Sequence, residues 1–173
     1  MDLVTDRQFS YLFLDKSLVQ VFYEFDRGEL RKARLAYYPF PIPTTSDQWE
    51  DYDTGLTDNL LSEMILALME EGDLVTNSSH FRIDYDATAR THSVSHCQFS
   101  GINDLRLPLN VIFTPFLFVD FIIRNVFPSV HRTQLVESIN YRPALSHARR
   151  SVETLDDSRE NNLYITVSTG DRT

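Results

Sequence analysis

The chain has 173 residues, of which 42% are hydrophobic and 12% aromatic, which is enough for one sizeable core and too little to favour two independent domains. With 16 lysines and arginines against 25 aspartates and glutamates, the formal net charge of −9 argues against a broad binding surface for duplex nucleic acid or an anionic membrane. Any site for an anion must therefore be local.

The cysteine content is typical of a protein in a reducing compartment. The single cysteine, Cys97, excludes an intramolecular disulfide and a cysteine-based zinc cage. The first six residues lack the basic and apolar regions of a signal peptide, and no stretch approaches the roughly 20 apolar residues that span a bilayer. We therefore expect a cytoplasmic protein that does not enter a membrane.

Two elements are predicted in the first part of the chain. Residues 18–25 and 31–38 have strand-like patterns, and Gly28 in the turn between them completes a β-hairpin. After a polar, acidic connection, Thr57 is suited to cap a helix from about residue 58 to residue 71, which ends at a glycine.

A strand with one polar face is the most informative feature of the sequence. Residues 80–85, HFRIDY, alternate in character, and side chains alternate across a strand. His80, Arg82 and Asp84 are therefore expected on one face, with the apolar residues on the other. If this face were only exposed to solvent, lysine, glutamate or threonine would be sufficient there. We therefore interpret it as the floor of a site.

Two further strands are predicted to extend this sheet. Residues 93–100 resume the alternation, and residues 105–109 follow after a short turn. The register that keeps the apolar residues together places Arg106 beside Gln98. Cys97 then points to the apolar face and is expected in the core rather than as a nucleophile. The polar residues expected on the shared surface are His80, Arg82, Asp84, His96, Gln98 and Arg106.

The C-terminal part combines one strong helix with weaker signals. Thr114 is suited to cap a helix over residues 115–127, which begins with proline and is predicted to be buried on most sides. Asp120 and Arg124 lie four apart and are expected to pair on its exposed side. The weaker signals are a helical segment at 133–139, an exposed helix or flexible loop at 146–162, a final strand at 163–167 and a fraying tail at 168–173.

These elements predict a single α+β domain over residues 1–173. A mainly antiparallel sheet is covered by two principal helices, 58–71 and 115–127, and bears one polar pocket. No internal repeat and no low-complexity tract indicates another organisation.

Three interpretations of the polar face are open. In the first it is a structural network, in which Arg82 pairs with a neighbouring aspartate and the histidines form hydrogen bonds with neighbouring residues. In the second, Asp84 and His96 bind a divalent metal ion, together with a ligand such as His92 or Asp86 from the connection between the strands. In the third it is a metal-free phosphodiester site, in which histidines move protons and arginines stabilise charge on the phosphate.

Of the two functional interpretations, the third is the leading hypothesis, and it needs neither a metal nor another cofactor. The residues assigned to catalysis are His80, Arg82, Asp84, His96 and Arg106, and those assigned to substrate binding are Arg90, His92 and Gln98.

A family resemblance accompanies these residues. The stretch 80–86, followed by His92, the Ser95-His96 pair, the Arg106-Leu-Pro sequence and the helix after Thr114, resembles an uncharacterised bacterial family, domain of unknown function 2290, over about residues 15–130. This resemblance implies a bacterial cytoplasmic protein encoded near defence or toxin genes, and it supplies no activity.

A second, weaker resemblance is to small bacterial toxins suspected of ribonuclease activity. It rests on the Arg-x-Asp strand followed by spaced histidines. Where those proteins carry clustered histidines, this chain has Cys97 and Gln98 after His96, and this departure puts the transfer of catalytic roles in doubt.

Two functions from different classes follow. The first is a component of a bacterial defence or toxin-like system that acts on single-stranded nucleic acid or nucleotides, because the net charge repels a long polyanion. The second is a non-catalytic acidic interaction subunit that binds and regulates a partner enzyme. A protein partner is expected in either case.

Overall fold

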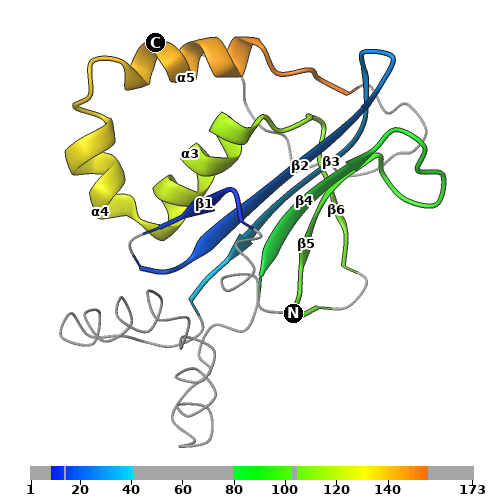
Figure 1. The fold of residues 1–173 in the computed structure, drawn as a ribbon, viewed down its shortest axis with the longest axis horizontal. Helices are drawn as coiled ribbons and strands as arrows, with labels where there is room; N and C mark the ends of the chain where they lie inside the picture. The colour runs from blue at the N-terminus through cyan, green and yellow to red at the C-terminus, as the bar shows by residue number, and fades with distance from the viewer. Residues whose placement is uncertain (1–8, 14, 41–79, 103–104, 156–173) are drawn as a thin grey trace, which may run out of the picture. The chain divides into compact units, whose positions relative to one another are not determined.

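The computed structural model describes residues 9–13, 15–40, 80–102 and 105–155 (Figure 1). The predicted helix at 58–71, the strand at 163–167 and the tail at 168–173 lie outside the described residues.

The chain divides into two compact units, each of which is assembled from separated segments. The first unit comprises residues 1–20 and 37–80, and the second comprises residues 21–36 and 81–173. A single domain over the whole chain stays a prediction.

The strands within the described residues form a six-stranded antiparallel sheet in the order β1-β2-β3-β4-β5-β6. Because each strand pairs with its neighbour in sequence, no crossover connection is needed. The predicted α+β class, with an antiparallel sheet, is confirmed. The strands are β1 (Tyr11–Leu12), β2 (Leu18–Asp26), β3 (Glu29–Tyr38), β4 (Phe81–Asp86), β5 (Ser95–Phe99) and β6 (Leu107–Pro108).

The hairpin of β2 and β3 forms where the sequence predicts it. Arg27 and Gly28 connect the strands and have φ angles of 52° and 85°. A two-residue turn of type I′ requires positive φ at both central positions, and its twist matches that of the strands. Arginine adopts this conformation at some cost, whereas glycine adopts it freely.

In the first unit, the segments around β1 and the end of β3 pack through aromatic rings. Phe13 contacts Tyr37 edge to face, with ring centroids 6.5 Å apart. The ring of His80 lies 5.0 Å from that of Tyr38. Val19 is completely buried.

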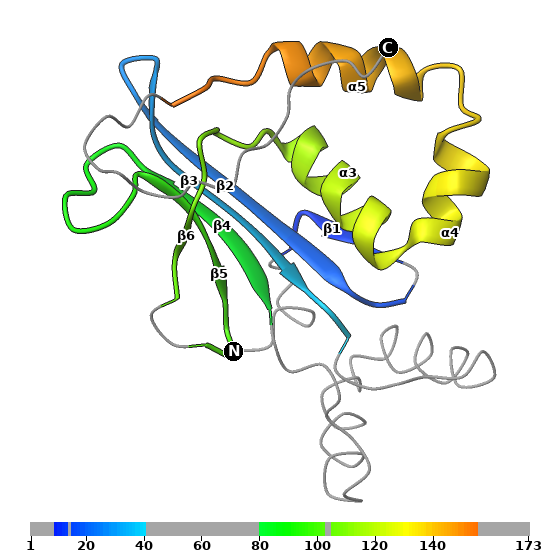
Figure 2. The same cartoon turned by 180° about the vertical axis from the view of Figure 1, so that it is seen from behind.

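In the second unit, the apolar face of β4 and β5 packs against helix α3 (Pro115–Val126). Figure 2 labels α3 and these strands. The ring of Phe81 stacks on that of Phe118 with centroids 5.9 Å apart, and Ile83 and Cys97 are buried on the same face. Burial raises the pKa of the Cys97 thiol, which agrees with a core role.

Helix α3 begins as predicted, but it is less buried than predicted. The Thr114 hydroxyl accepts a hydrogen bond from the Leu117 amide at 3.3 Å, and proline occupies the first helical position. Phe116 and Val126 are exposed, so the prediction of burial on most sides is wrong. One stripe of the helix is sufficient to cover the sheet.

Within the described residues of the second unit, three shorter helical elements follow α3. They are α4 (Pro128–Val130), the π-helical turn η2 (His131–Leu135) and α5 (Tyr141–Arg150). The helical segment predicted at 133–139 is therefore wrong in its bounds, because the helical turns occupy 128–135 instead.

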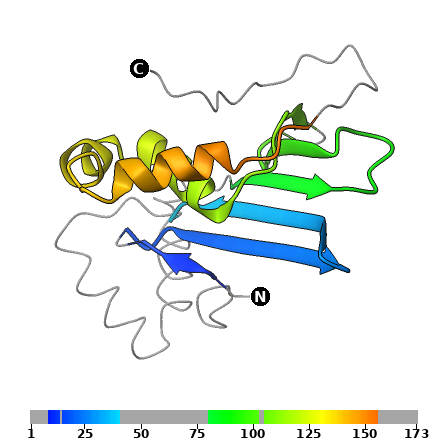
Figure 3. The ribbon, with the colours of Figure 1, turned by 90° about the horizontal axis from the view of Figure 1, so that it is seen from above.

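Helix α5 begins five residues before the charged segment in which a helix or loop was expected. Its buried residues, Tyr141 and Leu145, lie four apart on one face. Helix α3 packs against α5, and the two helices overlap in the view of Figure 3. The start was missed because Pro143 reads as a helix breaker, although the first turn tolerates proline.

A buried polar cluster joins these two helices. Arg124 Nε donates to Asp120 Oδ2 at 2.7 Å, and the Tyr141 hydroxyl donates to Asp120 Oδ1. The predicted Asp120–Arg124 pair is therefore present, but the expected exposed location is wrong, because Asp120 is only 7% exposed.

The tyrosines of this unit predict a loss of stability in alkali. Burial raises the pKa of Tyr23 and of Tyr141 to about 12, above the ordinary value of 10. As the pH rises, these tyrosines therefore lose their protons at a lower pH in the unfolded chain than in the folded protein. Their contribution to the free energy of unfolding is complete below about pH 10 and disappears as the pH rises toward about 12. Urea denaturation at pH 9 and pH 11 should show this decrease.

The decrease is at most about 1.4 kcal/mol per pH unit for each tyrosine. The Tyr141→Phe variant should show a shallower dependence on pH than the wild type. An unchanged slope in that variant would contradict the assignment to Tyr141.

Candidate functional site

The predicted polar face is present on the side of β4 and β5 that faces away from α3. Arg82 pairs with Gln98, and Asp84 pairs with His96, in the antiparallel register of the two strands. Leu107 lies opposite Cys97 on the next strand, as the predicted register requires. Four of the eight candidate residues are thus brought together by strand pairing alone.

Asp84 lies at the centre of this face and binds two arginines. Arg82 Nε donates to its Oδ2 at 2.6 Å, and Arg34 Nε donates to its Oδ1 at 3.0 Å. The exposed fractions of the side chains increase outward, from 13% for Asp84 to 26% for Arg82 and 59% for Arg34. One carboxylate is therefore shared by two cations, so these three side chains together carry an excess positive charge.

Arg34 was missed by the sequence analysis. Its alternation with the buried Ala33 and Leu35 signals an outward position on β3. That signal does not say which strand is adjacent, and only the pairing of β3 with β4 brings Arg34 to Asp84. We call Arg34, Arg82, Asp84, His96 and Gln98 the Asp84 cluster.

A chain of hydrogen bonds runs through the cluster to His96. Arg82 Nη2 donates to Gln98 Oε1, and Gln98 Nε2 donates to His96 Nε2 at 3.1 Å. His96 Nδ1 donates to the Ser93 carbonyl at 3.1 Å. Because the amide nitrogen of glutamine can only donate, His96 Nε2 must accept, so the proton of the neutral imidazole is on Nδ1.

The surroundings of His96 favour its neutral form. The side chain is nearly fully buried, and this desolvation is the largest cause that lowers the pKa of His96 below its ordinary value. Hydrogen bonding to Ser93 and the charge of Asp84 oppose the shift, whereas His92 and Arg106 add to it. His96 is therefore uncharged at neutral pH.

This lowered pKa predicts a loss of stability in acid. Since the folded protein binds the proton less readily than the unfolded chain, the stabilisation is complete above about pH 6.5 and is lost as the pH falls through the lower folded pKa. Two-bond ¹H–¹⁵N spectra should show the Nδ1–H form of His96 below pH 6.5. A His96 signal that titrates at or above pH 6.5 would contradict this prediction.

The two histidines beside Ser93 lie close together. The rings of His92 and His96 are 4.7 Å apart between centroids, and His92 Nδ1 donates to the same Ser93 carbonyl at 2.9 Å. His92 is exposed, and its Nε2 has no hydrogen-bond partner among the described residues. His92 is thus the histidine of this pair that solvent and solutes can reach.

The remaining candidate residues occupy different positions. Arg90 is exposed in the connection between β4 and β5, and Arg106 is exposed just before β6, close enough for its charge to act on His96. His80 belongs to the first unit, where its ring contacts Tyr38.

The ligand set considered for a metal is not assembled within the described residues. No group of three or more His, Cys, Asp or Glu side chains in those ranges could hold a metal ion. Both oxygens of Asp84 bind arginines. Asp86 accepts hydrogen bonds from the amide and hydroxyl of Thr88, which are the main causes that lower the pKa of Asp86.

The fold and this site define an α+β protein with a polar cluster on the open face of an antiparallel sheet. The chain belongs to the family described as uncharacterized conserved protein (DUF2290), whose model matches residues 1–167. The comparisons with curated proteins and with solved structures found no match. Among the helices in the described ranges, none is both long and apolar enough to cross a membrane.

Proposed function

We propose that this protein binds a nucleotide or single-stranded nucleic acid through phosphate groups at the Asp84 cluster, as a component of a bacterial cytoplasmic defence or toxin-like system. The observation that carries the proposal is the sharing of one carboxylate by two arginines in a chain of net charge −9. A local excess of positive charge attracts a phosphate, while the acidic remainder disfavours a long duplex.

Arg34 is the residue best suited to contact the phosphate. It binds Asp84 through Nε, and its two terminal nitrogens have no partner among the described residues. A guanidinium presents paired donors that match two oxygens of a phosphate. Arg106, exposed near His96, supplies a second cation.

His92 is the group in this pair that can move a proton. In the neutral imidazole, the hydrogen that is donated to Ser93 is on Nδ1, and Nε2 then has a lone pair. In the proposed reaction, Nε2 accepts the proton of an attacking hydroxyl as the new P–O bond forms. The leaving oxygen takes a proton from solvent as the old P–O bond breaks. His96, which is buried with both nitrogens bonded, is a positioning residue.

The Arg34→Ala variant tests phosphate binding, and Arg31→Ala is a matched control on the same strand. Arg31 pairs with Asp26 and Glu29, outside the cluster. We expect Arg34→Ala to weaken binding of a labelled single-stranded oligonucleotide about tenfold, which corresponds to about 1.4 kcal/mol, and Arg31→Ala to change it less than about twofold. Fluorescence anisotropy with RNA, DNA and mononucleotides measures both.

Turnover is tested with the same substrates, with and without divalent metal. We expect His92→Ala to lose turnover and retain binding. The His80→Ala/His96→Ala double variant is less informative, because removal of His96 leaves buried groups unpaired at a cost of about 1–3 kcal/mol. Equal binding by the Arg34 and Arg31 variants, or no binding by the wild type, would refute the proposal.

The internal pairing of the cluster favours a second candidate, the non-catalytic interaction subunit. Hydrogen bonds within the cluster connect Arg82 to Asp84 and to Gln98, and Gln98 to His96, as expected for a structural network. Strand β2 of the sheet also exposes Phe22 and Phe25. For this function, Phe25→Ser should abolish binding to a purified partner enzyme without lowering the melting temperature, and no phosphate ligand should bind.

A further inference from the structure

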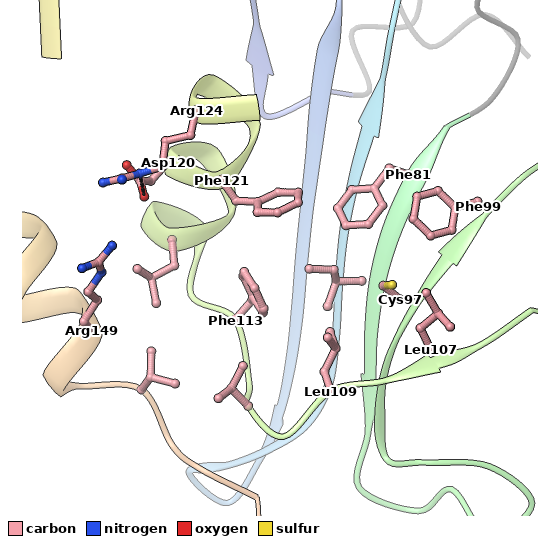
Figure 4. Close-up of a pocket in the computed structure, with 14 residues that line it drawn as sticks. Phe81, Cys97, Phe99, Leu107, Leu109, Phe113, Asp120, Phe121, Arg124 and Arg149 are labelled. Atoms are coloured by element: carbon pink, nitrogen blue, oxygen red, sulfur yellow. Dashed lines mark hydrogen bonds and ion pairs between the residues drawn. The ribbon is translucent and has the colours of Figure 1, made fainter. Parts of the chain in front are cut away.

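A cavity of about 400 Å³ lies in the second unit, on the face of the sheet opposite the Asp84 cluster. It is bounded by strands β4 to β6, helix α3 and helix α5 (Figure 4). Eleven of its fourteen lining residues are apolar, among them Phe81, Leu107, Phe113 and Phe121. This size and lining are typical of a site for a small molecule with an apolar body.

The three charged lining residues gather at one side of the cavity. Figure 4 shows Asp120 and Arg124 of α3 on the same side as Arg149 of α5, whereas Phe81, Phe99 and Leu107 lie on the strands at the other side. The cavity therefore has an apolar end and a charged end.

The charged end carries an excess positive charge. Both carboxylate oxygens of Asp120 already accept hydrogen bonds, one from Arg124 and one from the Tyr141 hydroxyl. The side chain of Arg149 is half-buried, and its guanidinium makes no hydrogen bond or ion pair with any of the described residues. Its neighbour Arg150 differs, since it is exposed and donates to the Ser146 hydroxyl at 2.7 Å.

We propose that this cavity binds a small amphipathic carboxylate, with its apolar body among the phenyl rings and its carboxylate paired with Arg149. A partly desolvated arginine gains most from an anion that matches its paired donors. A cationic ligand would meet two guanidinium groups against one carboxylate. A neutral apolar ligand would fill the same space and offer no acceptor to the guanidinium of Arg149.

Decanoate and 1-decanol are matched probes, because they share the apolar chain and differ in the head group. Isothermal titration calorimetry of the full chain should show at least tenfold tighter binding of decanoate. In the Arg149→Met variant, this preference should fall to within about twofold, and in the Arg150→Met control it should be unchanged. Melting temperatures of the unliganded variants show whether each is folded.

The position of the bound probe separates this proposal from phosphate binding at the Asp84 cluster. Decanoate should shift the backbone amide resonances of Leu107 and Phe113, which line the cavity, and leave that of Arg34 unchanged. Equal binding of decanoate and decanol, an unchanged preference in the Arg149 variant, or no binding of decanoate would each overturn the proposal. None of these results bears on the oligonucleotide experiments.

Discussion

Replacement of Phe118 by alanine is expected to lower the free energy of unfolding by about 3–5 kcal/mol. Phe118 is completely buried, and its ring lies nearly parallel to that of Phe81, with an interplanar angle of 6°. The substitution removes the contact that holds α3 against β4 and leaves a cavity that the surrounding strands cannot close. Urea denaturation followed by circular dichroism measures the change.

Phe116 offers a matched control on the same helix. The same Phe→Ala substitution there removes a side chain that is 40% exposed and whose ring lies 6.5 Å from that of Tyr141. We expect a cost below half of that at Phe118, because less apolar surface leaves water when Phe116 folds. Equal costs at the two positions would show that α3 does not dock through Phe118.

The second large effect is expected at Asp120. The Asp120→Ala variant should lose about 3 kcal/mol of stability, because it leaves the Arg124 guanidinium and the Tyr141 hydroxyl without their shared acceptor. This value is at the lower end of the range for buried ion pairs, since the Arg124 side chain is 33% exposed and water can partly replace the carboxylate. Thermal and urea denaturation report it.

A double-mutant cycle isolates the pair itself. The Asp120→Ala/Arg124→Ala variant should lose less stability than the sum of the two single variants, by about 0.5–3 kcal/mol. Strict additivity would mean that the 2.7 Å contact between Arg124 and Asp120 contributes no coupling energy.

These two predictions concern the scaffold, and they make the functional tests interpretable. Phe118 and Asp120 act on the helix-covered face of the sheet, whereas Arg34 and His92 lie on its polar side or in the adjoining connection. A variant of Arg34 that keeps the wild-type melting temperature and loses phosphate binding therefore identifies a binding role. A comparable loss of binding in Phe118→Ala would report unfolding instead.

Local patterns predicted much of the second unit. The alternation of residues 80–85 was sufficient to place Arg82 and Asp84 on one face of β4 and Ile83 on the other. The Thr114–Pro115 pair marked the start of α3. The register of β4, β5 and β6 followed from keeping Cys97 and Leu107 on one face. These features depend on neighbours in sequence or on short turns, and periodicity encodes them directly.

Contacts between distant segments were not predictable in this way. The sequence by itself determined the α+β class, the hairpin and the polar face of β4. Only the tertiary structure decided that Arg34 reaches Asp84 across 50 residues of chain, that the Tyr141 hydroxyl donates to Asp120, and that Arg149 lies at the charged end of a cavity. The physical reason is that periodicity specifies which face a side chain occupies, whereas its partner depends on which elements pack together.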